Sequence, residues 1–278
     1  MTNARIRTLA PSEVETLIDW AADEGWNPGE RDATAFRLAD PDGFLGAFVD
    51  GEMVAGISAV SYGSAFGFIG LYICRPDMRG KGFGKTVWDA GMARLAGRTL
   101  GLDGVPEQQA NYRAMGFVPA YRTFRYSGTI AAPANGSANI QPVSPDMLPS
   151  LEAFDRRFFP ASRRAFLQGW SAAPHVALVY MDGETVLGYG VARRCREGAK
   201  IGPLFAADQE SAEALLEELS RRCNCEIHID VPETSGSFAD TLLRHGMARG
   251  FETARMYRGP APLLHSGGIF GITTLELG

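Results

Sequence analysis

Apolar and polar positions recur along the first 130 residues with periods that predict a mixed order of helices and strands. A capping box, Ser12-x-x-Glu15, is predicted to open a helix. Four apolar positions follow it at helical spacing: Val14, Leu17, Ile18 and Ala21. Further along, alternating apolar runs separated by Gly and Asp predict an antiparallel meander. This mixture indicates an α/β fold with a mixed sheet.

The remaining elements of this part of the chain follow in a definite order. After the first helix we predict a second helix, three strands, a helix, a strand, a helix and a final strand. The expected ranges are Gly29–Asp40, Gly43–Asp50, Glu52–Tyr62, Ala65–Cys74, Phe83–Ala96, Thr99–Val105, Pro106–Met115 and Ala120–Thr129.

The same pattern occurs twice. Asp50–Val60 (DGEMVAGISAV) and Asp182–Ala192 (DGETVLGYGVA) both place a DGE turn before an alternating strand. Three further anchors follow in the same order in each half. They pair Ile69-Gly70 with Ile201-Gly202, Val105-Pro106-Glu107 with Val231-Pro232-Glu233, and FRYSG (Phe124–Gly128) with RMYRG (Arg255–Gly259). We therefore predict two copies of one fold.

The predicted domain boundaries follow from this repeat. One domain is expected over residues 1–130 and the second over residues 144–278. Residues 131–143 are rich in Ala, Pro, Asn, Gly and Ser and are expected to be a linker. Near the second domain's end, GGIFGITTLELG is too apolar to be free in solution, so we expect it to pack as a strand against the other copy.

Composition narrows the function classes. The chain has 278 residues and a formal net charge of −5, without the basic surplus of a general nucleic-acid binder. No apolar run is as long as a membrane span, and the N-terminal residues lack a signal-peptide core. Four cysteines do not make a disulfide framework in a chain of this size. The expectation is a reduced, cytoplasmic protein that contacts neither nucleic acid nor membrane.

A glycine-rich stretch, RGKGFGKT, lies between an expected strand and an expected helix, where backbone amides can bind phosphate. A P-loop would need glycine at Arg79, and a dinucleotide fingerprint would need it at Lys85. A third pattern, R-x-x-G-x-G, fits without a mismatch from Arg79 to Gly84.

With the preceding YICRPDM, this stretch resembles the acetyl-CoA loop of the GNAT N-acetyltransferase superfamily. The order of elements in the whole first copy resembles that fold as well. The resemblance implies that loop amides hold the pyrophosphate of coenzyme A and that the preceding strand holds its pantetheine. It places acetyl-CoA on Ile73, Cys74, Arg79, Gly80, Lys81, Gly82, Phe83, Gly84 and Lys85.

A second motif, NYRAMGF, resembles the family's Y-x-x-x-G-F. The resemblance implies that Tyr112 protonates the departing CoA thiolate, although Tyr112 could instead be a packing residue of an amphipathic helix. Many family members carry a glutamate base on the strand before the loop, where this chain has Phe68. A water chain or another carboxylate would have to replace it, and Glu30 and Asp32 are candidates.

The segment EGWNPGERDATAF is expected to wall the acceptor pocket by the same resemblance. Trp26 offers an aromatic face, and Asn27, Glu30 and Asp32 offer polar contacts, with Asp32 the best placed to touch an amine. The alternative is a helix–loop–helix connection in which Trp26 plugs the core.

The second copy has lost these motifs. The counterpart of the glycine loop is Ser211–Leu216 (SAEALL), and Phe238 or Leu242 stands in place of the tyrosine. We expect a degenerate GNAT-like domain. Cys223-x-Cys225-x-x-His228 is not expected to bind metal, because strand alternation would put His228 on the opposite face from the cysteines and a zinc site needs four ligands.

Together these features predict a tandem GNAT N-acetyltransferase, a monomer or homodimer. It would transfer acetyl from acetyl-CoA directly to a primary amine of a small molecule or peptide, without a metal. Transfer of a longer acyl group is open. A non-catalytic CoA-responsive regulatory protein is the rival from another class, favoured by Phe68 and opposed by the intact loop and Tyr112.

Overall fold

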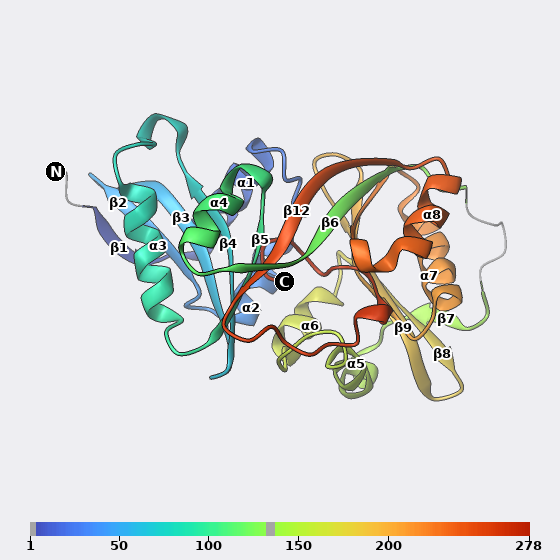
Figure 1. The fold of residues 1–278 in the computed structure, drawn as a ribbon. Helices are drawn as coiled ribbons and strands as arrows, with labels where there is room; N and C mark the ends of the chain where they lie inside the picture. The colour runs from blue at the N-terminus through green and yellow to red at the C-terminus, as the bar shows by residue number, and fades with distance from the viewer. Residues whose placement is uncertain (1–3, 132–136) are drawn as a thin grey trace.

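The computed structural model describes residues 4–131 and 137–278 and contains a thirteen-stranded mixed sheet with helices packed on it (Figure 1). The first copy comprises β1 (Arg5–Thr8), α1 (Pro11–Asp23), α2 (Asp32–Ala39), β2 (Phe44–Val49), β3 (Glu52–Tyr62), β4 (Phe66–Cys74), α3 (Phe83–Arg94), β5 (Thr99–Gly104), α4 (Gln109–Ala114) and β6 (Val118–Gly128). The second comprises β7 (Ile140–Pro142), α5 (Leu148–Asp155), α6 (Arg164–Trp170), β8 (Val176–Asp182), β9 (Thr185–Arg194), β10 (Ala199–Ala206), α7 (Gln209–Cys223), β11 (Ile227–Pro232), α8 (Gly236–Arg244), β12 (Ala248–Arg258) and β13 (Ile269–Gly271). The predicted α/β class and the repeated order of elements are confirmed.

The two copies exchange their last long strands. The sheet runs β1-β2-β3-β4-β5-β12-β6-β11-β10-β9-β8-β7. Strand β12 of the second copy therefore pairs with β5 of the first, and β6 of the first pairs with β11 of the second. Figure 1 shows β6 and β12 running side by side through the middle of the molecule. Residues 1–130 and 144–278 are thus two copies in sequence but not two separate bodies in space.

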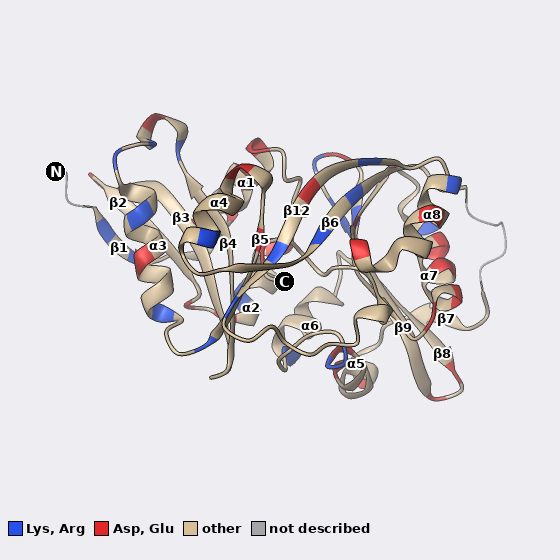
Figure 2. Ribbon diagram, viewed as in Figure 1, with Lys and Arg blue, Asp and Glu red and all other residues tan. Residues whose placement is uncertain are grey.

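Two buried ion pairs join each exchanged strand to the strand beside it from the other copy. Arg255 on β12 makes two hydrogen bonds to Asp103 on β5, both 2.8 Å long. Arg125 on β6 makes the matching pair to Asp230 on β11, at 2.8 and 3.0 Å. Figure 2 shows basic positions along both strands, and β12 carries an acidic position as well.

Helices from the two copies also share one core. Helix α2 packs on α6, where the rings of Phe36 and Trp170 stack with centroids 5.8 Å apart. Gly169 permits this approach, because a Cβ there would come 2.5 Å from Leu38. Phe36 and Trp170 belong to a single buried cluster that includes residues of both halves. The copies are therefore held together by core packing as well as by the sheet.

Three local predictions were wrong. Helix α1 begins at Pro11, and Glu13 rather than Glu15 accepts a hydrogen bond of 2.7 Å from the Ala10 amide, because Arg7 also pairs with Glu13. The expected linker 131–143 contains β7, which pairs with β8; its residues 132–136 lie outside the described part of the chain. Cys223 ends α7 instead of lying in a strand, so the alternation argument does not apply to it.

The segment 269–278 connects the two copies. Its first residues form β13, which pairs antiparallel with β10 of the second copy. Its last residues cross to the first copy, where the Ser58 hydroxyl donates to the Glu276 carbonyl oxygen at 3.0 Å and the Tyr62 hydroxyl donates to the Leu277 carbonyl oxygen at 3.1 Å. The expectation of a strand is confirmed for residues 269–271, but this strand pairs within its own copy, and it is the residues after it that contact the other copy.

Candidate active site

A gap between β4 and β5 defines the site. The two strands pair in parallel only from Phe66 to Ile69 of β4. Beyond that point β4 bulges against β3, and Leu71 takes a left-handed φ of 44°. A bulge bends a strand and increases its twist, so the rest of β4 diverges from β5. Among the strands that the structure describes, none pairs with the diverging half on its β5 side.

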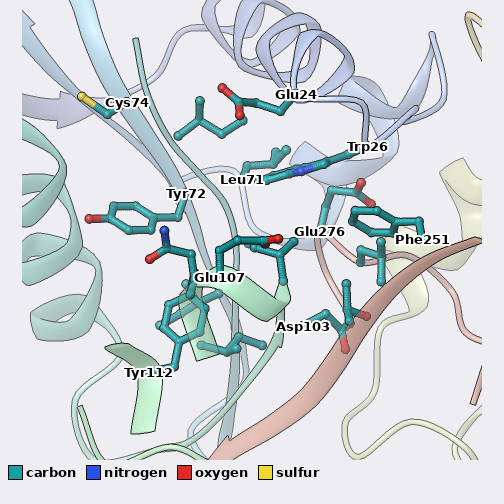
Figure 3. A pocket seen from close by; sticks show the side chains of 18 of the residues that line it. Glu24, Trp26, Leu71, Tyr72, Cys74, Asp103, Glu107, Tyr112, Phe251 and Glu276 are labelled. Atoms are coloured by element: carbon teal, nitrogen blue, oxygen red, sulfur yellow. The ribbon is translucent and has the colours of Figure 1, made fainter. Parts of the chain in front are cut away.

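A pocket of about 670 Å³ opens beside this gap (Figure 3). Its wall comes from both copies: the loop after α1, β4, the start of the glycine loop, β5, α4 and the turn before it, β12 and the segment 272–278. The side chains labelled in Figure 3 are Glu24, Trp26, Leu71, Tyr72, Cys74, Asp103, Glu107, Tyr112, Phe251 and Glu276.

The glycine loop lies at the start of α3, next to the end of β4. Gly80 and Gly82 have φ values of 75° and 88°, and a Cβ at either would meet no heavy atom within 4 Å. Gly82 is the N-cap, and no side chain caps the helix. The amides of the first turn are therefore available to an anion. A pyrophosphate group fits this loop, because open space, uncapped amides and cationic side chains come together there.

Three cations accompany these amides. Arg79 donates to the Cys74 carbonyl oxygen at 3.1 Å and forms an ion pair with Glu24. Lys81 and Lys85 are exposed, and Lys85 pairs with Asp89.

Tyr112 is fixed by aromatic packing. Its ring stacks on Trp88 with centroids 5.6 Å apart, and a Cβ on Gly104 would come 2.9 Å from it. Burial raises the pKa of the Tyr112 phenol, so the phenol is protonated at neutral pH. Tyr72 also contacts Trp88, with ring centroids 5.1 Å apart and the two ring planes tilted by 59°. Tyr112 thus packs in a cluster and also lines the pocket, where it can donate a proton.

Ile73 and Cys74 lie on the diverging half of β4 and line the pocket. Burial raises the pKa of the Cys74 thiol. The thiol is therefore neutral at physiological pH and a poor nucleophile. The strand offers its backbone, rather than this side chain, to a ligand in the gap.

The expected acceptor residues separate into two groups. Trp26 lines the pocket. Asn27 instead donates to the Glu197 carbonyl oxygen at 2.9 Å, and Glu30 is exposed and borders a different hollow. The expectation for Asp32 is wrong, because its carboxylate is fully buried in an ion pair with Arg193 of β9. This loop holds the copies together where an acceptor wall was expected.

The four pocket residues that come from the second copy escaped the sequence analysis. Phe251 and Thr253 come from the exchanged strand β12, and Leu275 and Glu276 come from the segment 272–278. Each lies more than a hundred positions from the glycine loop, and neither period nor spacing links them to it. Phe68 is buried beneath Gly278, since a Cβ on Gly278 would come 2.8 Å from its ring.

The second copy closes the corresponding site with its own chain. Strand β10 pairs with β11 only from Ala199 to Ile201, and β13 occupies the space beyond. Helix α7 is capped by Asp208, whose carboxylate accepts from the Ser211 amide at 2.8 Å. A carboxylate at this position repels an anion. The expected degeneracy therefore has a physical basis in a filled gap and an acidic cap.

Within residues 4–131 and 137–278, no group of three or more His, Cys, Asp or Glu side chains is arranged to hold a metal ion. None of the helices in those ranges is long and apolar enough to span a membrane. His228 donates to or accepts from the Ser127 hydroxyl at 2.8 Å, so its ring already has a partner.

Strand β4 diverges from β5 beside an uncapped glycine loop, and the chain repeats one order of elements twice. These features define a tandem acyltransferase architecture. Family comparison agrees: residues 12–118 match the Acetyltransferase (GNAT) family and residues 151–271 match an Acetyltransferase (GNAT) domain. The chain belongs to the GNAT family and is an acyltransferase with two GNAT domains.

Individual relatives span nearly the whole chain. A holothin acyltransferase of Pseudoalteromonas sp. (strain SANK 73390) is 31% identical over 269 residues, which cover 96% of this chain and 92% of that protein. A putative acetyltransferase from Pyrococcus horikoshii superposes with a TM-score of 0.83 at 21% identity, covering 100% of this chain and 97% of that one. A tandem GNAT protein from the clavulanic acid biosynthesis pathway gives 0.62 at 13% identity, over 93% and 100% of the two chains. The last two similarities concern the fold.

Proposed function

We propose that the first copy transfers an acetyl group from acetyl-CoA to the primary amine of a small molecule. The observation that carries this proposal is that three features lie next to one another. They are the uncapped glycine loop at Gly80–Gly84, the half of β4 that does not pair with β5, and the pocket that Tyr112 lines. Acetyl-CoA would bind with its pyrophosphate on the loop amides and its pantetheine along Ile73 and Cys74. Acetyl-CoA supplies an activated acyl group in this arrangement.

The chain's own residues would then act on the reacting groups. Backbone amides of the bulged strand β4 near Leu71 would polarise the acyl carbonyl. Tyr112 would hand its phenolic proton to the departing sulfur. Because burial holds the pKa of the phenol above that of a thiol, this transfer depends on direct contact between the hydroxyl and the sulfur as the bond to the acyl carbon breaks. Direct attack by the amine needs no enzyme nucleophile, consistent with the raised pKa of Cys74.

The acceptor side of the pocket favours a flat, compact amine. Trp26 and Phe251 present aromatic rings there, and Leu275 adds apolar surface. Aromatic walls bind planar ligands by stacking. The relative named for holothin makes holothin the first amine to test, followed by amino acids, polyamines, aminoglycosides and peptide N-termini.

The test is a free-thiol assay for CoA release over this amine panel. The expected result is turnover with at least one small amine, and a fall in kcat of about 10- to 1,000-fold in Tyr112→Phe with little change in acetyl-CoA affinity. The matched control is Tyr180→Phe, which removes a hydroxyl from β8 of the second copy. Binding of acetyl-CoA without turnover of any amine would favour the CoA-responsive regulatory alternative instead.

A further inference from the structure

Four carboxylates line the pocket, and three of them are unsuited to accept a proton. Glu24 is paired with Arg79, and Asp103 is held by both arms of Arg255. Glu107 lies exposed on the short helical turn before α4. Glu276 is different: it is 2% exposed, and its Oε1 atom has no hydrogen-bond partner among the residues that the structure describes.

The backbone of Glu276 is fixed against β4. The Ser58 hydroxyl donates to its carbonyl oxygen at 3.0 Å. Gly70 makes the close approach possible, because a Cβ there would come 2.1 Å from the same oxygen. The Thr274 hydroxyl accepts from the amides of Glu276 and Leu277 at 3.1 and 2.8 Å. Glu276 is thus anchored next to the bulge where β4 and β5 diverge.

Charges around Glu276 come from several elements. The side chains whose charges act on it or on its neighbours are Asp32 of α2, Arg125 of β6, Arg193 of β9, Lys200 of β10 and Asp230 of β11. Arg193 is paired with Asp32, and Arg125 is paired with Asp230.

Because Arg193 and Arg125 are already paired, Lys200 is the cation that remains as the counter-charge of Glu276. Its ammonium group donates to the Trp26 carbonyl oxygen at 2.9 Å and lies 3.9 Å from Asp230. With Glu276 ionised, this buried cluster contains three cations and three carboxylates and is neutral. Burial raises the pKa of Glu276, while Lys200 and Arg193 oppose that rise. A buried carboxylate with a free oxygen and a raised pKa is a stronger base than an exposed one.

We propose that Glu276 is the general base of the acyl transfer; this inference rests on the proposed function above. Its carboxylate accepts one proton from the amine nitrogen as the bond between that nitrogen and the acyl carbon forms. The bond between the acyl carbon and sulfur breaks, and sulfur takes the proton of Tyr112. The proton on Glu276 then returns to the Tyr112 phenolate through solvent, so the products are an amide and a neutral thiol.

This assignment also gives the second copy a role. Its closed gap holds residues 269–271 as β13, which directs the following residues into the pocket of the first copy. The degenerate copy thereby supplies a catalytic group to the active one.

The experiment compares wild type, Glu276→Gln and Glu276→Asp, with Glu184→Gln in the exposed DGE turn of the second copy as control. For the amine that wild type uses, kcat/KM should fall by about 10²- to 10⁴-fold in Glu276→Gln, with partial recovery in Glu276→Asp. Wild-type kcat/KM should decline as the pH falls below the pKa of Glu276, and Glu276→Gln should lose that decline. Acetyl-CoA affinity, measured by titration calorimetry, should be unchanged.

A second readout does not depend on turnover. Because the folded-state pKa of Glu276 is raised, wild type binds a proton more readily when folded and should gain stability as the pH falls towards the range where Glu276 titrates, and Glu276→Gln should lack that gain. Turnover by Glu276→Gln equal to wild type would overturn the base assignment and leave the acyltransferase function intact. No turnover by wild type with any amine would overturn both.

Discussion

The cross-copy ion pair between Arg255 and Asp103 is the contact whose removal should be most costly. The perturbation is Arg255→Met, which keeps an apolar stem of similar length and removes both hydrogen bonds to Asp103. The arginine and aspartate side chains are 7% and 0% exposed, respectively. The substitution therefore leaves a buried carboxylate without its counter-charge.

The magnitude follows from that burial. Breaking one partner of a buried ion pair costs about 3–5 kcal/mol. In a chain of this size, each kcal/mol shifts Tm by about 2–4 °C, so Tm should fall by roughly 6–20 °C. Burial already raises the pKa of Asp103, against the opposing effect of Arg255. Without Arg255 the carboxyl group should bind a proton on folding, so the loss should shrink as the pH falls.

Thermal unfolding followed by circular dichroism measures the effect. The control is Arg122→Met, which breaks an ion pair with Glu233 that also joins the copies but whose side chains are 55% and 37% exposed. An exposed pair contributes about 0–1 kcal/mol, so this variant should unfold close to wild type. The double variant Arg255→Met/Asp103→Leu should recover most of the loss. Equal, small shifts for Arg255→Met and Arg122→Met would refute the exchanged-strand arrangement of charges.

Two further predictions concern the loop and the second exchanged strand. Gly82→Ala should weaken acetyl-CoA binding about tenfold, as measured by calorimetry, because a left-handed φ of 88° costs a side chain about 1–2 kcal/mol. The control is Gly51→Ala in the β2–β3 turn, where the glycine has the same φ and the same open space, and this variant should leave binding unchanged. Equal binding by both variants would count against the loop as the binding site. Burial would raise the pKa of Asp230, but Arg125 and Lys200 lower it to about 2. Its ionisation therefore stabilises the fold by about 2 kcal/mol above pH ~4, and this is lost as the pH falls towards 2. The difference in unfolding free energy between wild type and Asp230→Asn should narrow over that range, and a constant difference would contradict the assignment.

The sequence predicted the contents of each copy better than the contacts between them. The DGE and VPE anchors identified both copies, and period and spacing placed the helices and strands within a few residues. The exchange of β6 and β12 was invisible, because FRYSG and RMYRG carry similar patterns and either strand could complete either sheet. Alternation fixes which face of a strand is buried but not which strand lies beside it.

The predictions for the site residues divide in the same way, into those read from a local motif and those that depend on distant segments. The glycine loop and Tyr112 could be singled out because the roles proposed for them require particular residues at fixed local spacing. Asp32 was misassigned, because the sequence around it does not show that Arg193, from a distant strand, neutralises its carboxylate. Glu276 gave no signal at all: its position depends on β13 filling a gap in the second copy, which only the packed structure reveals.

Our central claim is that the first copy binds acetyl-CoA, while the second copy closes its own gap and places Glu276 in the pocket of the first. A crystal structure of the chain with CoA tests this most directly. The account predicts one CoA per chain, with its pyrophosphate on the amides of Gly80–Gly84, and β13 still paired with β10. CoA bound between β10 and β11 with β13 displaced, or Glu276 turned away from the pocket of the first copy, would contradict it.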